Sequence, residues 1–448
     1  MLREDVSGWL AKRRDDDRFS RFVRHLDVLD AVFSRMLDAL DHELASLGGA
    51  RPAEVVYERC RELDGSLLVV ARTFGWYAEK YDQRLDDRWA GVLRAADEIV
   101  RSCWTEPFAA LRMAPPTGPL PYLDARFDAM ATPRVSVPPD LRAPADALVA
   151  EYVRELPVPT IALPEVVRQE PWWLVLAAHE TGHHVQRDLA PALVADTRAA
   201  VAAAVGACAG ADLADDWAGW AVEAFADAYS VLMVGAGAVW AIEELQLAGP
   251  PRLVTAPAPG DRYPPPAVRL GLLGELCRAA GVRPDGGPPG AAELLGWLRA
   301  LPDTAVRPAA RAAVERHLAA VPAVADALVD LPVGGSSLRR VTGLRPDWFA
   351  GRGRVHGWSQ HLRSGRPVLS PLEVRPAARL VVAAGVAAYG EPGTAADLDR
   401  LRANMLDLLP SCGPPGVLAA PPPEADIGAL ADRLAADLVR RSAQGAAR

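Results

Sequence analysis

The chain has 448 residues, more than one ordinary hydrophobic core accommodates, so the length predicts two or three lobes. Half of the residues are hydrophobic and 24% are charged, a composition typical of a globular protein and not of a disordered or fibrous one. The net charge of −8 excludes a generally basic surface, so a nucleic-acid-binding surface would have to be local. Nucleic acid is therefore not expected as a partner.

The cysteines and the N-terminus bear on the cellular compartment. The five cysteines are scattered and include no C-x-x-C pair, which fits a reducing compartment and argues against a thiolate zinc site. The first eight residues carry charges where a secretory signal would be apolar. The uncharged run 228–242 is too short to span a bilayer. These observations lead us to expect a cytoplasmic protein without a membrane segment.

Residues 1–112 form the first predicted region. Apolar residues recur there at steps of three and four, the spacing of one face of a helix, and the pattern continues over 55–81 and 89–103. We expect a helical N-terminal region that either binds a protein partner or packs against the rest of the chain.

Residues 113–285 form the second predicted region, and its first part contains proline and short β-like runs. Two such runs cover 134–138 and 158–163. Prolines at positions 157, 159 and 164 favour an edge strand for the second run, because proline has no backbone N–H to donate to a neighbouring strand. An extended peptide could add to such an edge as a further strand.

The densest group of metal-binding side chains lies in the helix predicted over 171–188. His179 and His183 are four residues apart, so both imidazoles lie on one helical face and can bind one cation. Glu180 follows the first histidine and can act on a water instead of the metal. This H-E-x-x-H arrangement is typical of zinc hydrolases with a glutamate general base. The neighbouring His184 points away from this face, and we expect it to be structural or solvent-facing and not a ligand.

A catalytic zinc needs a third protein ligand and one open position. The helical run predicted over 214–247 carries Glu223 and Asp227, again four apart and flanked by apolar residues. We predict Glu223 as the third ligand. Asp227, one turn further on, could accept the free ring N–H of a ligating histidine and so fix its tautomer. The alternatives are an exposed acidic stripe and a core helix whose histidines bind no metal.

The segment His179-Glu180-Thr181-Gly182-His183, followed by Glu223 and Asp227, resembles the gluzincin zinc metallopeptidases, the thermolysin-like group. The resemblance covers residues 110–285, with specific motifs over two short stretches. It implies a zincin core with His179, His183 and Glu223 as ligands, Glu180 as base and Asp227 as their support. The forty residues between His183 and Glu223 exceed the gap usual in the thermolysin-like enzymes, so an additional helix is expected between them. Val222 replaces the asparagine that the family places before this glutamate.

In metallopeptidases a tyrosine, histidine or arginine beyond the third ligand often stabilises the oxyanion formed during attack on the carbonyl. Tyr263, near the end of the proline-rich loop 250–266, and Arg269, just after it, are the candidates for this catalytic role. A rigid connector carrying a surface cation is the alternative. His356 and His361 are more distant candidates.

Residues 286–448 form the third predicted region, with helices expected over 291–301, 307–328, 376–389 and 395–409 and a last amphipathic helix after a proline-rich linker. Segment 352–363 mixes arginines, histidines and Trp358, which would suit a small phosphate-binding patch. This region too could bind a protein partner.

The sequence as a whole predicts a mainly α protein with a small β-sheet, in which helical N- and C-terminal regions flank a gluzincin-like core. The predicted function is that of a zinc-dependent metallohydrolase, a peptidase acting on a peptide or protein substrate. The alternative is a non-catalytic helical scaffold with a structural or vestigial zinc site. A metal-dependent nuclease is disfavoured by the acidic charge and by imidazole-rich ligation.

Overall fold

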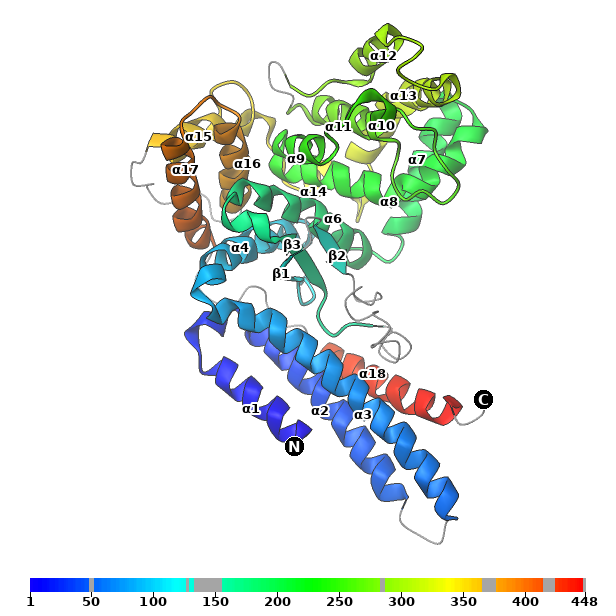
Figure 1. The fold of residues 1–448 in the computed structure, drawn as a ribbon, viewed down its shortest axis with the longest axis vertical. Coiled ribbons are helices and arrows are strands. Elements are labelled where there is room, and N and C mark those ends of the chain that lie inside the picture. Colours follow the sequence, from blue (N-terminus) through cyan, green and yellow to red (C-terminus); the bar gives the residue numbers. More distant parts are fainter. Residues whose placement is uncertain are drawn as a thin grey trace.

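The computed structural model describes residues 1–47, 52–125, 129–132, 155–282, 287–364, 376–413 and 424–445. The described chain is mainly helical and contains two small sheets, which confirms the predicted mainly α class with a small β-sheet. Figure 1 shows a helical bundle at one end and a larger body at the other, with a small sheet between them. The run predicted as β-like over 134–138 lies outside the described residues.

The N-terminal bundle combines both ends of the chain. Its elements are α1 (Leu2–Arg14), the 3-10 helix η1 (Asp17–Phe22), α2 (Val23–Ser46), α3 (Ala53–Asp82), η2 (Gln83–Leu85) and α18 (Glu424–Gly445). On α2 a stripe of apolar residues is buried: Leu26, Leu29, Val32, Phe33, Leu37 and Leu40. This stripe has the spacing of one helical face, and α18 packs against α2 and α3, as Figure 1 shows.

The bundle changes the division of the chain expected from sequence. The last helix, α18, belongs with the N-terminal helices and not with a C-terminal region. Conversely, α4 (Asp87–Ala110) packs against α6 and the sheet, inside the larger core, although it falls within the predicted region 1–112. Helical periodicity identifies a helix but not its packing partner, so it could not place this boundary.

A three-stranded sheet lies beside the motif helix. It contains β1 (Leu120–Asp124), β2 (Met130–Thr132) and β3 (Thr160–Pro164) in the order β1-β3-β2. Strand β3 pairs in parallel with β1 and antiparallel with β2, so it is the central strand. The prediction of an edge strand over 158–163 is therefore wrong. Pro157 and Pro159 precede the strand and Pro164 ends it, so these prolines remove no donor from its interior. The edge beside the motif helix is β2.

The central helices follow the sheet. They are η5 (Glu165–Arg168), η6 (Pro171–Val175), α6 (Leu176–Asp188), α7 (Leu193–Cys208), α8 (Ala211–Val234), α9 (Gly237–Leu245), α10 (Pro250–Leu253) and α11 (Pro266–Ala280). The single helix expected over 214–247 is divided into α8 and α9. Gly235 has a φ of 62°, and a Cβ there would lie 2.4 Å from the ring of Phe349. A left-handed glycine ends α8 for this reason.

The remaining elements extend the same core. They are α12 (Ala291–Ala300), α13 (Pro308–Val329), β4 (Pro332–Val333), β5 (Ser336–Ser337), α14 (Leu338–Val341), η7 (Pro346–Trp348), α15 (Arg354–Ser364), α16 (Ala377–Tyr389), α17 (Ala395–Leu408) and η8 (Leu409–Ser411). Helix α13 packs on α7 and α11, and α16 packs on α4 and η6. One hydrophobic cluster runs from Val92 to Cys412, so residues 286–413 do not form a separate lobe.

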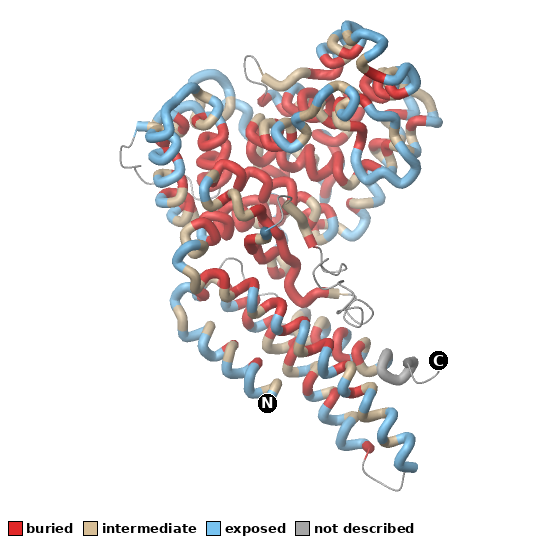
Figure 2. Tube along the Cα trace, viewed as in Figure 1, coloured by how far each residue is buried: buried red, intermediate tan, exposed pale blue. Residues whose placement is uncertain are grey.

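Burial is highest where the metal-binding side chains lie. Figure 2 shows buried chain concentrated in the middle of the larger body and exposed chain along the outer helices and the far end of the α2–α3 hairpin. Both α6 and the second half of α8 belong to this buried centre. Among the described helices, no single one is long and apolar enough to cross a bilayer. Two consecutive segments, Pro171–Asp188 and Leu193–Cys208, are long and apolar enough only when they are taken together, and the chain bends by 106° between them.

Candidate metal centre

The motif helix begins where the sequence places it. Pro171 opens the 3-10 turn η6, where its missing N–H costs nothing, and the chain continues directly into α6. The segment between the histidine-bearing helix α6 and the carboxylate-bearing helix α8 forms α7. This is the additional helix that the forty residues between His183 and Glu223 predict. Helix α7 packs along α8, and α8 returns antiparallel to α6, so Glu223 comes back to the face that carries His179.

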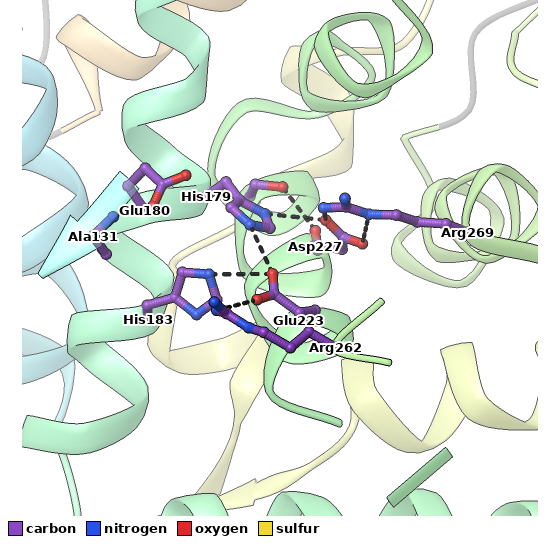
Figure 3. A network of polar contacts seen from close by, with 9 residues as sticks. Ala131, His179, Glu180, His183, Glu223, Asp227, Arg262 and Arg269 are labelled. Carbon is purple, nitrogen blue, oxygen red and sulfur yellow. Dashed lines mark hydrogen bonds and ion pairs between the residues drawn. The ribbon is translucent and has the colours of Figure 1, made fainter. Parts of the chain in front are cut away.

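Three side chains from these two helices converge on one point (Figure 3). Nε2 of His179 and Nε2 of His183 each lie 3.4 Å from Oε2 of Glu223. One ligand atom from each of the three residues lies within 4.8 Å of the others. The side chains of His179, His183 and Glu223 are only 8%, 12% and 2% exposed. The predicted ligand set is thus assembled and nearly dry.

The spacing of these atoms fits zinc. Oε2 of Glu223 is buried and receives no well-aligned hydrogen bond, since Nε2 of His179 and Nε2 of His183 both lie 3.4 Å away, at the long end of the range. Two ligand atoms at zinc–nitrogen and zinc–oxygen bond lengths, set at a tetrahedral angle, are separated by about 3.4 Å. A buried acceptor without a donor costs free energy unless a cation compensates it. Imidazole and carboxylate ligands are also the set that zinc prefers in catalytic sites.

A buried ion pair supports the first histidine from behind. Asp227 is fully buried and its Oδ1 lies 3.0 Å from Nδ1 of His179, although the ring N–H is not well aligned with that oxygen. Arg269 holds the same carboxylate with two hydrogen bonds of 2.8 Å, from Nε to Oδ2 and from Nη2 to Oδ1. The carboxylate is therefore fixed from both sides and can orient the imidazole so that Nε2 faces Glu223.

Arg269 was one of the two candidates for stabilising the oxyanion. Its guanidinium instead binds Asp227, on the side of His179 away from the ligand atoms, and the residue is 5% exposed. The reason is charge: Asp227 is buried one turn beyond Glu223 and requires a cation. Sequence spacing gives no information on this pairing, since forty-two positions separate the two residues.

Charge in the centre is arranged to attract a cation. Burial disfavours the imidazolium of His179, but hydrogen bonds with Asp227 and Glu223 prevail and raise its pKa to about 10. Burial likewise disfavours ionised Glu223, but hydrogen bonds with His179 and His183 prevail and lower its pKa. The pKa of Asp227 is lowered too, where burial is outweighed by the charge of Arg269. Both carboxylates are thus ionised, and a positive charge between them is favoured.

Glu180 is held at the edge of the sheet. The backbone N–H of Ala131, in the edge strand β2, donates to Oε2 of Glu180 over 2.5 Å. Glu180 is 6% exposed and its charge acts on His179, as Figure 3 also indicates by their proximity. The predicted base therefore stands between the ligand cluster and the strand edge. Sequence alone could not pair Ala131 with Glu180, because the two lie forty-nine positions apart in different elements.

The loop before α11 covers the more exposed side of the centre. Nη2 of Arg262 lies 3.0 Å from Oε1 of Glu223, and the arginine side chain is 76% exposed. Because Oε1 is bound in this way, Oε2 is the oxygen left for a metal. Tyr263 is 44% exposed, and its ring lies 4.9 Å from Cζ of Arg269 and 5.8 Å from Cζ of Arg262. The sequence did not single out the contact of Arg262 with Glu223.

The charged groups of the metal centre act electrostatically on the phenol of Tyr263. Burial, followed by the negative charges of Glu223 and Glu180, raises its pKa to about 12 despite the two nearby arginines. Tyr263 therefore keeps its proton at neutral pH and remains a hydrogen-bond donor. Its placement leaves it a candidate for stabilising the oxyanion.

The other histidines lie elsewhere. Nε2 of His184 is 3.1 Å from the carbonyl oxygen of Thr160, which ties α6 to the central strand β3 and agrees with the expected structural role. His356 and His361 lie on α15, which packs against α16 and α17. Trp358 makes an edge contact with His361 there, and the three-residue cluster on α6 and α8 does not include this helix.

Close packing of α6 against α8 sets the distance between the ligands. A Cβ added at Gly182 would lie 3.1 Å from the side chain of Tyr229 and 3.2 Å from Cα of Ala226. Any larger side chain here would require α6 or α8 to shift, while the hydroxyl of Tyr229 holds α8 by donating to the carbonyl oxygen of Cys103.

The Gly182→Val variant is expected to bind zinc much more weakly than wild type, since the added side chain separates α6 from α8 and draws both histidines away from Glu223. We also expect a loss of about 1–3 kcal/mol in stability from overpacking. Zinc affinity by competition with a fluorescent chelator and unfolding by urea measure the two effects. Gly219→Ala is the matched control, because a Cβ on that residue of α8 would meet nothing within 4 Å. Unchanged zinc affinity in Gly182→Val would contradict this account of the packing.

The Asp227→Asn variant is expected to lower zinc affinity by about 10- to 100-fold while leaving the three ligands in place. An amide no longer fixes the tautomer of His179, and beside Arg269 its oxygen is drawn towards the guanidinium. Isothermal titration of the metal-free protein with zinc measures the change. A wild-type affinity in this variant would show that Asp227 serves the fold alone.

No family model, curated protein or solved structure matches the chain.

Proposed function

We propose that the protein is a zinc-dependent hydrolase that cleaves peptide bonds. The observation that carries the proposal is the cluster of His179, His183 and Glu223, assembled from two helices with Glu180 beside it. Within the described ranges this cluster has three members, so a fourth coordination position is not taken by a protein ligand there. Three protein ligands and an open position distinguish a catalytic zinc site from a structural one.

Each residue has a defined task in this proposal. His179, His183 and Glu223 hold the metal, and Asp227 with Arg269 keeps His179 in the binding orientation. Zinc, when bound, polarises the scissile carbonyl and makes water more acidic. Glu180 accepts the proton of the attacking water and delivers it to the leaving amine. Tyr263, a phenol that is protonated at neutral pH and whose pKa is raised further to about 12, donates a hydrogen bond to the oxyanion.

A peptide substrate is favoured by the strand edge beside the centre. Among the described strands, β2 pairs only with β3, and Ala131 in the middle of β2 contacts Glu180. An extended peptide that added to this edge would pass directly over the carboxylate that acts as base. The resemblance to the gluzincins, stated above for the motif residues, points to the same substrate class and implies a gluzincin-like core.

The alternative of a scaffold with a structural zinc site predicts a different ligand set. Structural sites are closed by four protein ligands, and a fourth ligand from the described residues is not present in the cluster. On the side of Arg262 and Tyr263, the centre is covered by a surface loop, since these two side chains are 76% and 44% exposed. These observations favour the hydrolase.

The test uses purified full-length protein, stripped of metal by a chelator and then reloaded with one equivalent of zinc. A mixture of synthetic peptides is incubated with each form, and new termini are identified by mass spectrometry. We expect cleavage by the zinc-loaded form alone, and no zinc binding by His179→Ala. Stoichiometric zinc without any hydrolysis of peptides or other amides would favour the scaffold, and failure to bind zinc would refute both.

A further inference from the structure

A second group of charged side chains lies far from the metal centre, where the N-terminal bundle meets the core. A partly open cavity of about 30 Å³ lies there between η1 and α2 on one side and α4 with residues 117–121 on the other. Its charged lining comprises Arg21, Arg24, Arg101 and one carboxylate, that of Asp97, and its apolar wall includes Phe22 and Trp104. Three cations around one small cavity are unusual in a chain with a net charge of −8.

Arg24 is the residue that requires an explanation. It is 5% exposed, and none of its three guanidinium nitrogens has a hydrogen-bond partner in the structure. Burial lowers its pKa to about 10, which still leaves it charged at neutral pH. Asp27 acts on it electrostatically, but the carboxylate of Asp27 binds Arg14. A buried, charged and unpaired guanidinium costs several kcal/mol unless another group compensates it.

The acidic groups near the cavity are already engaged. Glu98 pairs with Arg101 through Oε2, at 2.8 Å from Nε, and with Arg21. The carboxylate of Asp97 binds Arg84. Nη2 of Arg101 has no hydrogen-bond partner either. Four guanidinium groups thus face two carboxylates, and the excess positive charge is centred on Arg24.

His25 completes the polar lining without removing this excess. Its Nδ1 lies 2.8 Å from the hydroxyl of Tyr81. The rest of the wall consists of Val100, the prolines at 119 and 121, and residues 117–118. The carboxylate of Asp97 in the lining is bound by Arg84, so it provides no hydrogen-bond partner for the guanidinium of Arg24.

We propose that this cavity binds one small anion of the size of chloride, held chiefly by Arg24 and Arg101. About 10–15 Å³ is enough for one water molecule, so the cavity has room for a monatomic anion such as chloride. Guanidinium groups with free N–H donors form charge-assisted hydrogen bonds with an anion. The anion would link the bundle, through Arg24 of α2, with the core, through Arg101 of α4.

Bromide is the probe for this site. Crystals of the full-length wild-type protein, grown without halide and soaked in sodium bromide, are expected to show an anomalous peak in the cavity beside the guanidinium of Arg24. Water alone in the cavity, or bromide only at surface arginines, would overturn the proposal. This measurement does not depend on any variant folding.

A second measurement uses thermal stability. We expect the melting temperature of wild type to rise as sodium gluconate is replaced by sodium bromide at constant ionic strength, because gluconate is too large for the cavity. Arg24→Met removes the cation and retains most of the side-chain volume, so its melting temperature should not depend on bromide. Arg18→Met, which removes an exposed arginine paired with Asp16 in the same segment, should keep the wild-type dependence. An equal bromide dependence in wild type and Arg24→Met would refute the site.

Discussion

The Glu180→Gln variant is expected to bind zinc as tightly as wild type and to cleave peptides with a kcat lower by about 10²- to 10⁴-fold. Glutamine has the shape of glutamate, and its carbonyl oxygen can still accept the N–H of Ala131, so the local geometry is retained. It cannot accept a proton from water, however, and the step that needs a general base is lost. The two readouts are zinc stoichiometry by atomic absorption and peptide cleavage under saturating substrate.

The control for this prediction is Glu165→Gln. Glu165 lies in η5, the turn that leads towards the motif helix, and is partly exposed. This variant removes a carboxylate of the same kind and should retain both zinc and activity. If Glu180→Gln kept the wild-type kcat, the proposed mechanism would be wrong even with zinc bound. If it lost zinc, Glu180 would be acting on the fold of the centre and not as a base.

Helical spacing explains how much of the centre could be predicted from sequence. His179 and His183 on α6, and Glu223 and Asp227 on α8, each lie four residues apart, so each pair shares one face as soon as its helix forms. Apolar neighbours placed both pairs on buried faces. The need of these buried groups for a cation led to the prediction that the two helices meet. The structure brings His179, His183 and Glu223 together.

Contacts between elements far apart in the chain were beyond such reasoning. Ala131 reaches Glu180 because β2 pairs with β3, and the pairing order of short strands is not encoded in their own composition. The prolines around 158–163 were consistent with an edge strand, yet they flank β3, which is central. Arg24 lies on α2 among buried residues that are mostly apolar, and only the folded chain shows that its guanidinium has no hydrogen-bond partner.

Arg269 shows that the sequence reveals the chemistry of a residue but not the partner that it binds. Its position beyond the third ligand suited an oxyanion donor, and its chemistry is that of a cation that binds an anion. The anion that it binds in the structure is Asp227, through two parallel hydrogen bonds in a buried setting. Through Asp227, the contacts of Arg269 in the structure bear on the orientation of His179.

The Arg269→Met variant is expected to destabilise the metal-free protein by about 3–5 kcal/mol, because the fully buried carboxylate of Asp227 loses both guanidinium hydrogen bonds and keeps only His179 beside it. Methionine fills much of the volume of the arginine stem, so the loss reflects charge more than a cavity. Unfolding of the core by urea, followed by tryptophan fluorescence, measures the change. Metal-free protein is used because bound zinc would add its own stabilisation to the folded state.

The double variant Asp227→Asn/Arg269→Met separates charge from packing. An uncharged amide in the same place needs no cation, so the double variant is expected to be more stable than Arg269→Met alone. Arg299→Met, which removes a 70% exposed arginine on α12, should change stability by no more than about 0.5 kcal/mol. A double variant as unstable as the sum of the two single changes would mean that Arg269 and Asp227 do not act as a pair. In that case the orientation of His179 would have to depend on other contacts of α6.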